Sequence, residues 1–276
     1  GILELFKEIE TRNEEPVIDN VIFNSPRKLL DKIDKIDESN LLSYKQAYEL
    51  EQYLLNHQKI NWETSIDAKN LENKLNELFN TPNLSFRIFS PNEDSLKAYA
   101  SNKGAYLTSD YRCDWGSHIS TLIKSIDDKS QDRSASNMTS IVLLLTYYEK
   151  NYLFTADVTP IRLNQIIDEL KGQNPLINFE QIKLPHHGSY RSLNAQILQK
   201  INCNNFIIST NSKKHFLPNK RAFLKILKNR KSREKINFFF NYGEVISNLK
   251  ISKADEKEYN FSLVPNNKND SYAIDI

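Results

Sequence analysis

Two histidines stand side by side in the segment INFEQIKLPHHGSYRS (residues 177–192), directly after a run that predicts a strand. They are His186 and His187, and the whole chain contains only five histidines. An imidazole at the end of a strand is well placed to bind a metal ion, because the strand is rigid and the following loop leaves a cavity. Neighbouring side chains on an extended segment point to opposite sides, so we expect one ring to face the site and the other to support it or to contact substrate.

A second predicted strand, YLFTAD (residues 152–157), ends in Asp157. A carboxylate together with an imidazole suits zinc, manganese or iron. Gly188 allows the backbone to turn sharply after the histidines, and Ser189 can cap the next segment or bind a ligand. Each feature also has a simpler explanation, since an aspartate after a strand is commonly a cap and a histidine pair is commonly a surface feature.

The segments around these residues alternate between predicted strands and helices. We expect strands at 138–148, 152–157, 177–185, 204–210 and 235–242, and helices at 159–171, 192–201 and 218–229. Thr159 can cap the first of these helices, Pro160 suits its first turn, and Gly172 follows its end. This alternation indicates a layered α/β fold with helices packed on the faces of a sheet.

The rest of the chain gives a less regular pattern. We expect helices at 1–15, 68–79 and 95–102, strands at 17–24 and 83–91, and a largely helical region at about 26–80. Residues 104–137 are polar and show no sustained period, which predicts a mobile loop or insertion with a short helix at about 119–126. The polar tail after residue 250 offers edge strands at most.

Composition limits the class of protein. The 276 residues are 39% hydrophobic and 11% aromatic, with a net charge of +2, which is typical of a globular domain. The longest apolar run is too short to cross a bilayer, and Cys113 and Cys203 form neither a disulfide framework nor a paired metal motif. We therefore expect a cytoplasmic protein without a membrane partner.

The order of the motifs resembles the metallo-β-lactamase fold. Residues 136–228 contain an Asn-x-x-Ser strand, a strand ending in Ala-Asp, a strand ending in His-His-Gly-Ser and a Ser-Thr-Asn strand end. Within that fold the chain is similar to the branch that includes the hydrolase domain of competence DNA-uptake channels and relatives from AVAST-type anti-phage systems. The resemblance implies a single domain over residues 1–276 with an αββα sandwich architecture.

The resemblance also implies roles for individual residues. Asp157 matches the aspartate that bridges two metal ions, and His186 and His187 match the pair that supplies a late metal ligand. The remaining matches line the site or bind substrate: Asn137, Ser140, Ser189, Ser209, Thr210 and Asn211. The implied cofactors are two divalent metal ions, with zinc favoured and manganese as the alternative, and they would activate a water molecule for hydrolysis.

Two departures from the family pattern concern the ligands. Leu217-Pro218 stands where the family has His-Pro, and His215 lies two residues earlier. His215 is therefore a candidate catalytic residue that contacts the leaving group or phosphate, or else a solvated histidine. The His-x-His-x-Asp-His loop of the fold is absent, and GILELFKEIE (residues 1–10) resembles the glycine and helix that follow that loop in the defence branch. We expect the chain to begin just after the loop and to lack the first strands.

These features favour a metal-dependent phosphodiesterase or nuclease, with a role in anti-phage defence. Residues 213–235 contain ten Lys and Arg against one Glu, which suits a nucleic-acid backbone, although a solvated helix face explains them equally well. A catalytically degenerate scaffold in a defence complex is an alternative, and a small-molecule hydrolase such as a lactonase is another. Possible protein partners are a component of such a complex or the missing N-terminal segment.

Overall fold

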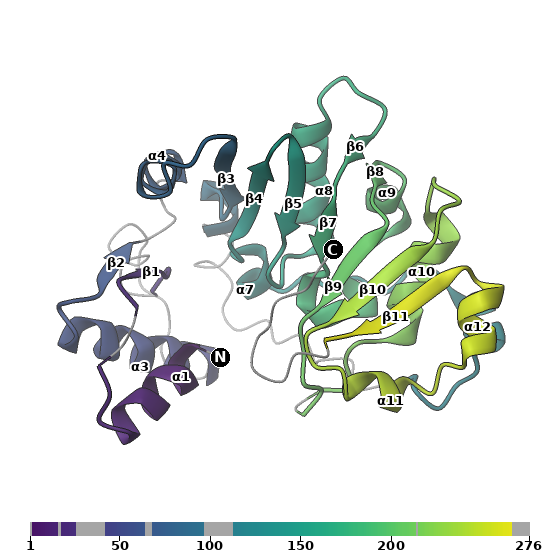
Figure 1. Cartoon of the computed structure of the whole chain (residues 1–276), viewed down its shortest axis with the longest axis horizontal. Helices are drawn as coiled ribbons and strands as arrows, with labels where there is room; N and C mark the ends of the chain where they lie inside the picture. Colours follow the sequence, from purple (N-terminus) through teal and green to yellow (C-terminus); the bar gives the residue numbers. More distant parts are fainter. Residues whose placement is uncertain are drawn as a thin grey trace.

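The protein is an α/β protein built around a seven-stranded mixed sheet (Figure 1). The computed structural model describes residues 2–15, 18–25, 42–63, 68–96, 113–213 and 215–266. The strand order is β11-β10-β9-β7-β5-β4-β3. The strands are β3 (Leu84–Ser90), β4 (Val142–Tyr147), β5 (Lys150–Phe154), β7 (Gln181–Lys183), β9 (Asn205–Ile208), β10 (Ile236–Phe240) and β11 (Phe261–Pro265). The predicted α/β class is confirmed.

The strand directions bring distant parts of the chain together at the carboxyl ends of the parallel strands. β3, β4 and β5 are joined by antiparallel pairing, whereas β5, β7, β9, β10 and β11 run parallel to one another. Phe154 pairs with Lys183, and Lys183 pairs with Ile207. The residues that follow these three strands therefore meet at the carboxyl ends of β5, β7 and β9.

Helices cover one face of this sheet and form the main hydrophobic core with it. They are α8 (Pro160–Lys171), α9 (Ala195–Leu198), α10 (Lys220–Asn229) and α6 (Ile119–Leu122). Leu153, Ile182 and Phe238 point from the strands into this core, where Ile166 and Phe223 of the helices meet them. The start of α8 follows the prediction, because the Thr159 side chain accepts a hydrogen bond from the Arg162 N–H.

Side chains from neighbouring helices bind the backbone at both edges of the sheet. On β3, the Asn76 side chain of α4 (Ala68–Leu78) accepts from Phe86 N at 3.0 Å and donates to Phe86 O at 3.2 Å. Glu72 of the same helix accepts from Ile88 N at 2.6 Å. On β11, Glu256 of α12 (Lys253–Glu258) accepts from Leu263 N at 3.2 Å. These contacts satisfy edge groups that would otherwise be open to another strand.

The N-terminal part has a smaller core of its own. α1 (Ile2–Thr11) and α3 (Leu42–Asn56) accompany two short parallel strands, β1 (Asn20–Ile22) and β2 (Asn61–Glu63). Phe6 stacks on Tyr53 with the ring centroids 4.4 Å apart. In the part of the chain that the structure describes, no helix is long and apolar enough to cross a membrane.

Several elements differ from the sequence-based expectation. The predicted strand 177–185 is two short strands, β6 (Ile177–Asn178) and β7, because the chain leaves the sheet at Phe179 and Glu180 to pair β6 with β8 (Ile201–Asn202). The polar tail after residue 250 contributes the edge strand β11, as expected, and also the helix α12, which was not predicted. The helix α11 (Val245–Leu249), just before the tail, was not predicted either. Parts of the helical region 26–80 and of the predicted helix 95–102 lie outside the described residues, as do residues 104–112.

Residues 113–137 agree in part with the predicted loop. The short helix expected at about 119–126 is confirmed by α6 and the 3-10 turn η1 (Ile123–Ser125), and Ile119 and Leu122 lie in the main core. Residues 126–134 have no regular secondary structure, and the helix α7 (Ala135–Met138), which was not predicted, follows them. Asp114 accepts hydrogen bonds from the backbone N–H groups of Lys220 and Arg221, both at 3.0 Å, so this segment caps the start of α10. The polar residues that suggested a loop are partners of backbone groups.

The edge contact of Asn76 gives a test of the fold. Asn76→Ala leaves the outward backbone groups of Phe86 without partners, so we expect the free energy of unfolding to fall by about 1–3 kcal/mol. Asn73→Ala is the matched control, because Asn73 is exposed on the same helix. Urea denaturation of both variants measures the difference. Equal stability of the two variants would contradict this role of Asn76.

Candidate metal-binding site

The histidine pair lies in a left-handed turn. His186, His187 and Gly188 have φ values of 46°, 57° and 81°. The expectation of an extended segment is therefore wrong. His186 N donates to Ala156 O at 3.0 Å, and Ser189 N donates to His186 O at 3.0 Å, so backbone hydrogen bonds close the turn.

The turn is a strained arrangement, and a second strained residue lies beside it. A left-handed conformation costs a residue with a side chain roughly 1–2 kcal/mol. Ala156 has φ 45° and immediately precedes Asp157, so the ends of β5 and β7 both carry left-handed residues with side chains. Strain of this kind persists where packing holds it, and it clusters at functional sites.

Packing against a loop 30 residues later holds the turn in place. A Cβ atom built on Gly188 would lie 2.8 Å from Cβ of Pro218, so the backbone of the turn rests directly on that proline. Asn219 N donates to Gly188 O at 3.0 Å. The loop 211–219 therefore supports the histidines through the backbone and Pro218.

Asp157 and His187 converge across the ends of two neighbouring parallel strands. His187 Nε2 lies 3.8 Å from Asp157 Oδ1, and their side chains are 41% and 37% exposed. His187 Nδ1 lies 2.5 Å from Ser209 O at the end of β9. A carbonyl oxygen only accepts, so Nδ1 carries the proton and Nε2 of the neutral ring presents its lone pair. Burial lowers the pKa of His187 despite the nearby Asp157 carboxylate, which favours the neutral ring.

His186 makes a different contact, with Asp132 of the segment before β4. His186 Nδ1 lies 3.3 Å from Asp132 Oδ2, and Asn137 Nδ2 donates to the same oxygen at 2.7 Å. Burial acts to raise the pKa of Asp132, but hydrogen bonds from His186, Ser134 N and Asn137 outweigh it and lower the pKa. Burial acts to lower the pKa of His186, but the hydrogen bond to Asp132 and the charge of Asp157 raise it overall.

Lys183 lies close to Asp157, and the sequence analysis did not identify it. Its Nζ donates to Ala156 O at 3.1 Å. Burial lowers the pKa of Lys183, and the charge of Asp157 partly offsets this effect. The ammonium group thus supports the strained residue before Asp157 and contributes positive charge to the site.

The other predicted site residues lie in several different environments. Ser140 is half-buried, with its backbone N–H bonded to Asn137 O at 3.2 Å. The Ser189 side chain is buried and accepts from Arg191 N, so it caps the 3-10 turn η3 (Tyr190–Ser192). This contact matches the capping role rather than the substrate-binding role expected for Ser189.

The residues after β9 extend the site in part. Asn241 joins β9 to the end of β10, accepting from Thr210 N at 3.1 Å and donating to Ser209 Oγ at 3.3 Å. Asn211 is exposed and its side chain accepts from Lys213 N, which forms a local turn. His215 is exposed on the loop beyond, and none of the contacts that join Asp132, Asp157, His186 and His187 involves it.

The donor atoms fit a metal ion in part. Two atoms that bind one zinc ion at about 2.1 Å each lie at most about 4.2 Å apart, a limit that the 3.8 Å between Asp157 Oδ1 and His187 Nε2 meets. Within the described residues, however, no group of three or more His, Cys, Asp and Glu side chains is placed to hold a metal ion. The site as described supplies two ligands, and zinc in catalytic sites usually has three from the protein.

The basic stretch 213–235 does not form one continuous surface. Lys220 and Lys225 are buried, with 2% and 0% exposed, and they bind backbone and carboxylate oxygens. α10 connects the end of β9, beside the site, to the start of β10. The start of β10 lies at the amino ends of the parallel strands, opposite the site. Lys228 and the exposed basic residues that follow it therefore lie away from Asp157. Lys213 is exposed on the site side.

A cavity of 370 Å³ lies on the side of the sheet away from the site, between the start of β5, the end of α8 and β6. Lys150 and Glu180 line it and form an ion pair at 3.4 Å. Lys171 also lines it, and its Nζ binds two backbone oxygens. Three of its four charged side chains are thus paired with one another or with backbone, and we assign the candidate chemistry to the strand ends instead.

Comparison with known proteins does not name a family for this chain. No protein-family model matches the chain, and no curated protein matches it. The candidate site therefore depends on the geometry of Asp157 and the two histidines.

Gly188 provides a test of the turn. In Gly188→Ala, the left-handed conformation costs about 1–2 kcal/mol, and the clash with Pro218 adds about 1–3 kcal/mol. We expect a loss of about 2–5 kcal/mol in the free energy of unfolding. Gly116→Ala is the matched control, because a Cβ atom there meets nothing within 4 Å. Thermal and urea unfolding compare the two. A Gly188→Ala protein as stable as the control would show that Pro218 does not hold the turn.

Proposed function

We propose that the protein is a metal-dependent hydrolase of the metallo-β-lactamase type that acts on phosphodiesters. The observation that carries the proposal is the convergence of Asp157 and His187. His187 offers the lone pair of Nε2 toward Asp157 while Ser209 O holds its other nitrogen. A carboxylate and an oriented neutral imidazole at adjacent strand ends form the ligand pair of a hydrolytic metal site.

The protein groups around this pair have separate tasks in the proposed site. Asp157 and His187 are the metal ligands that the described residues contribute. The carbonyl of Ser209 fixes the His187 tautomer and ring orientation. A divalent ion bound here supplies Lewis acidity and lowers the pKa of a bound water molecule. Further ligands come from outside the described residues.

Positive charge close to Asp157 supports a phosphodiester substrate. Lys183 lies beside Asp157, and Lys213 is exposed on the loop that follows β9, at the carboxyl ends of the same parallel strands. Positive groups beside a metal ligand pair suit an anionic substrate, for which a phosphodiester backbone is the candidate predicted from the composition of residues 213–235. The buried lysines of α10 contribute nothing to this surface.

A degenerate scaffold is the second candidate function. The observation that favours it is that only two ligands come together among the described residues. A protein that kept the fold and lost metal binding would retain the strained turn as a structural feature. The two candidates differ in whether metal binds at Asp157.

Equilibrium dialysis of the full chain against Zn²⁺ and Mn²⁺, followed by hydrolysis of bis-p-nitrophenyl phosphate, tests the proposal. We expect bound metal and turnover that a chelator abolishes. Asp157→Asn and His187→Gln should each weaken metal binding by more than about 10-fold, since even a supporting partner of a ligand is worth about 10–100-fold. Asp168→Asn is the control, because Asp168 pairs with Lys200 on the surface of α8.

Two outcomes of this experiment would count against the enzyme. Metal binding that is equal in wild type, Asp157→Asn and His187→Gln would place the ion elsewhere. A wild-type chain that binds no metal and does not hydrolyse the phosphodiester would support the scaffold.

A further inference from the structure

We propose that Asp132 is a positioning residue that fixes the tautomer of His186, and that the buried Lys225 holds Asp132 in place. This positioning does not depend on the proposed function, in which Asp157 and His187 are the metal ligands. The sequence analysis assigned no role to Asp132 and counted Lys225 only among the basic residues of 213–235.

Asp132 is built as an acceptor for His186. Its side chain is 7% exposed, and its Oδ1 accepts from Ser134 N at 2.9 Å. Its Oδ2 accepts from Asn137 Nδ2 at 2.7 Å and faces His186 Nδ1 at 3.3 Å. Asn137 Nδ2 and a protonated His186 Nδ1 are both donors, so they share the carboxylate oxygen and do not bond to each other across their 3.4 Å separation.

The carboxylate therefore selects the form of the His186 ring. A hydrogen bond from Nδ1–H to an ionised carboxylate leaves Nε2 of the neutral ring with the lone pair. Carboxylates in this position orient histidine ligands of metal ions and raise their basicity. Asp132 does for His186 what the Ser209 carbonyl does for His187, so both rings are held through Nδ1.

Hydrogen bonds join residues 126–132, which include Asp132, to η3, the turn that follows the histidines. We call this set of hydrogen bonds the clamp. Asp132 N donates to Arg191 O at 2.9 Å, and Arg191 Nη2 donates to Gln131 O at 3.2 Å. Tyr190 OH donates to Asp127 O at 2.6 Å and accepts from Asp127 N at 2.9 Å. Both ends of the His186–Asp132 contact are thereby tied to η3, which fixes the distance between them.

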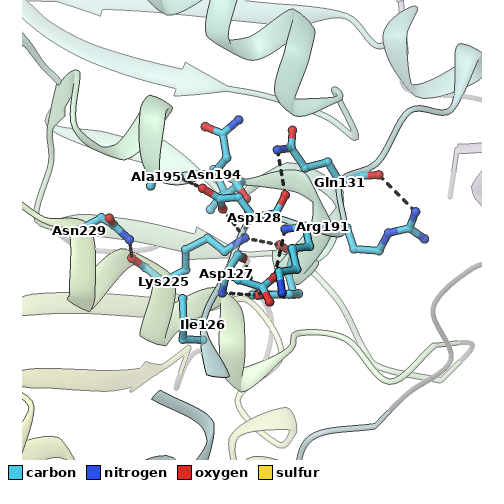
Figure 2. A network of polar contacts seen from close by, with 12 residues as sticks. Ile126, Asp127, Asp128, Gln131, Arg191, Asn194, Ala195, Lys225 and Asn229 are labelled. Carbon is cyan, nitrogen blue, oxygen red and sulfur yellow. Dashed lines mark hydrogen bonds and ion pairs between the residues drawn. The ribbon is translucent and has the colours of Figure 1, made fainter. Parts of the chain in front are cut away.

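Lys225 of α10 contacts both segments of the clamp from inside the core (Figure 2). Its side chain is 1% exposed, and its Nζ lies 3.0 Å from Asp128 Oδ1. Nζ also donates to Tyr190 O at 3.2 Å and to Leu193 O at 2.9 Å, and it lies 3.9 Å from the centroid of the Tyr190 ring. The second oxygen of Asp128 accepts from Ala195 N at 2.9 Å.

The buried charge explains why this clamp holds one geometry. An ammonium group without water needs several oxygen partners, and here they come from Asp128 and the 190–193 backbone. Moving the 126–132 segment would take Asp128 away from Lys225 and leave a charge without its partner. The segment that carries Asp132 is therefore fixed relative to the histidine turn.

Nuclear magnetic resonance of ¹⁵N-histidine-labelled full chain, free of metal in the presence of a chelator, tests the proposal. Two-bond ¹H–¹⁵N correlations report which ring nitrogen carries the proton, and a His186→Gln variant assigns the signal. In wild type, at a pH where the ring is neutral, we expect His186 as the Nδ1–H tautomer. In Asp132→Ala we expect it to change to the Nε2–H tautomer or to a mixture, with Asp168→Ala as the unchanged control.

The part assigned to Lys225 has its own readout. Lys225→Met removes the charge while keeping the length of the side chain, and we expect the His186 signal to show both tautomers. The tautomer is measured on the metal-free protein, so its outcome does not depend on the proposed function.

The tautomer also distinguishes positioning from simple stabilisation. A lower melting temperature of Asp132→Ala with an unchanged Nδ1–H tautomer would overturn the positioning role. If the variant does not fold, the wild-type spectrum still decides, because an Nε2–H tautomer of His186 would by itself contradict the proposal. A single Nδ1–H tautomer in Lys225→Met would overturn the part assigned to Lys225.

Discussion

The left-handed turn at residues 186–188 is the constraint on which the candidate site depends. β5 and β7 are adjacent and parallel, so Asp157 and the histidines would lie near each other in any turn geometry. With positive φ at both histidines, His187 Nε2 lies 3.8 Å from Asp157 Oδ1 while His186 reaches Asp132. The turn is costly for side-chain-bearing residues, and the contact of Gly188 with Pro218 keeps it in place.

Charge compensation extends from this turn into the core. Lys183 supports the residue before Asp157, Asp132 accepts from His186, and Lys225 pairs with Asp128. Each contact joins segments that are distant in sequence, so the site is held by long-range contacts to the sheet. The most exposed part is the pair Asp157 and His187, where a ligand has access.

The sequence predicts the strands and helices that carry the site better than it predicts the local conformation. The alternation of apolar runs and the cap at Thr159 give the order from β4 to α10 correctly, because these elements have strong periods and local signals. The histidine turn was mistaken for an extended segment, since the contact with Pro218 that imposes positive φ is not local.

Asp132 and Lys225 were missed for a similar reason. Asp132 lies in a polar segment without a period, and its partner His186 is 54 residues away. Lys225 looks like a surface lysine in a basic helix, and only the fold turns it inward toward Asp128. The pairing of Asp157 with a histidine was proposed from strand ends, and here the sheet places the two side chains side by side.

Anomalous diffraction from a crystal of the full chain soaked in Zn²⁺ shows directly whether Asp157 and His187 bind one metal ion. We expect a zinc peak within about 2.0–2.2 Å of both Asp157 Oδ1 and His187 Nε2, with His187 Nδ1 still bonded to Ser209 O. Zinc bound only at other residues, or a His187 ring turned away from Asp157, would contradict it.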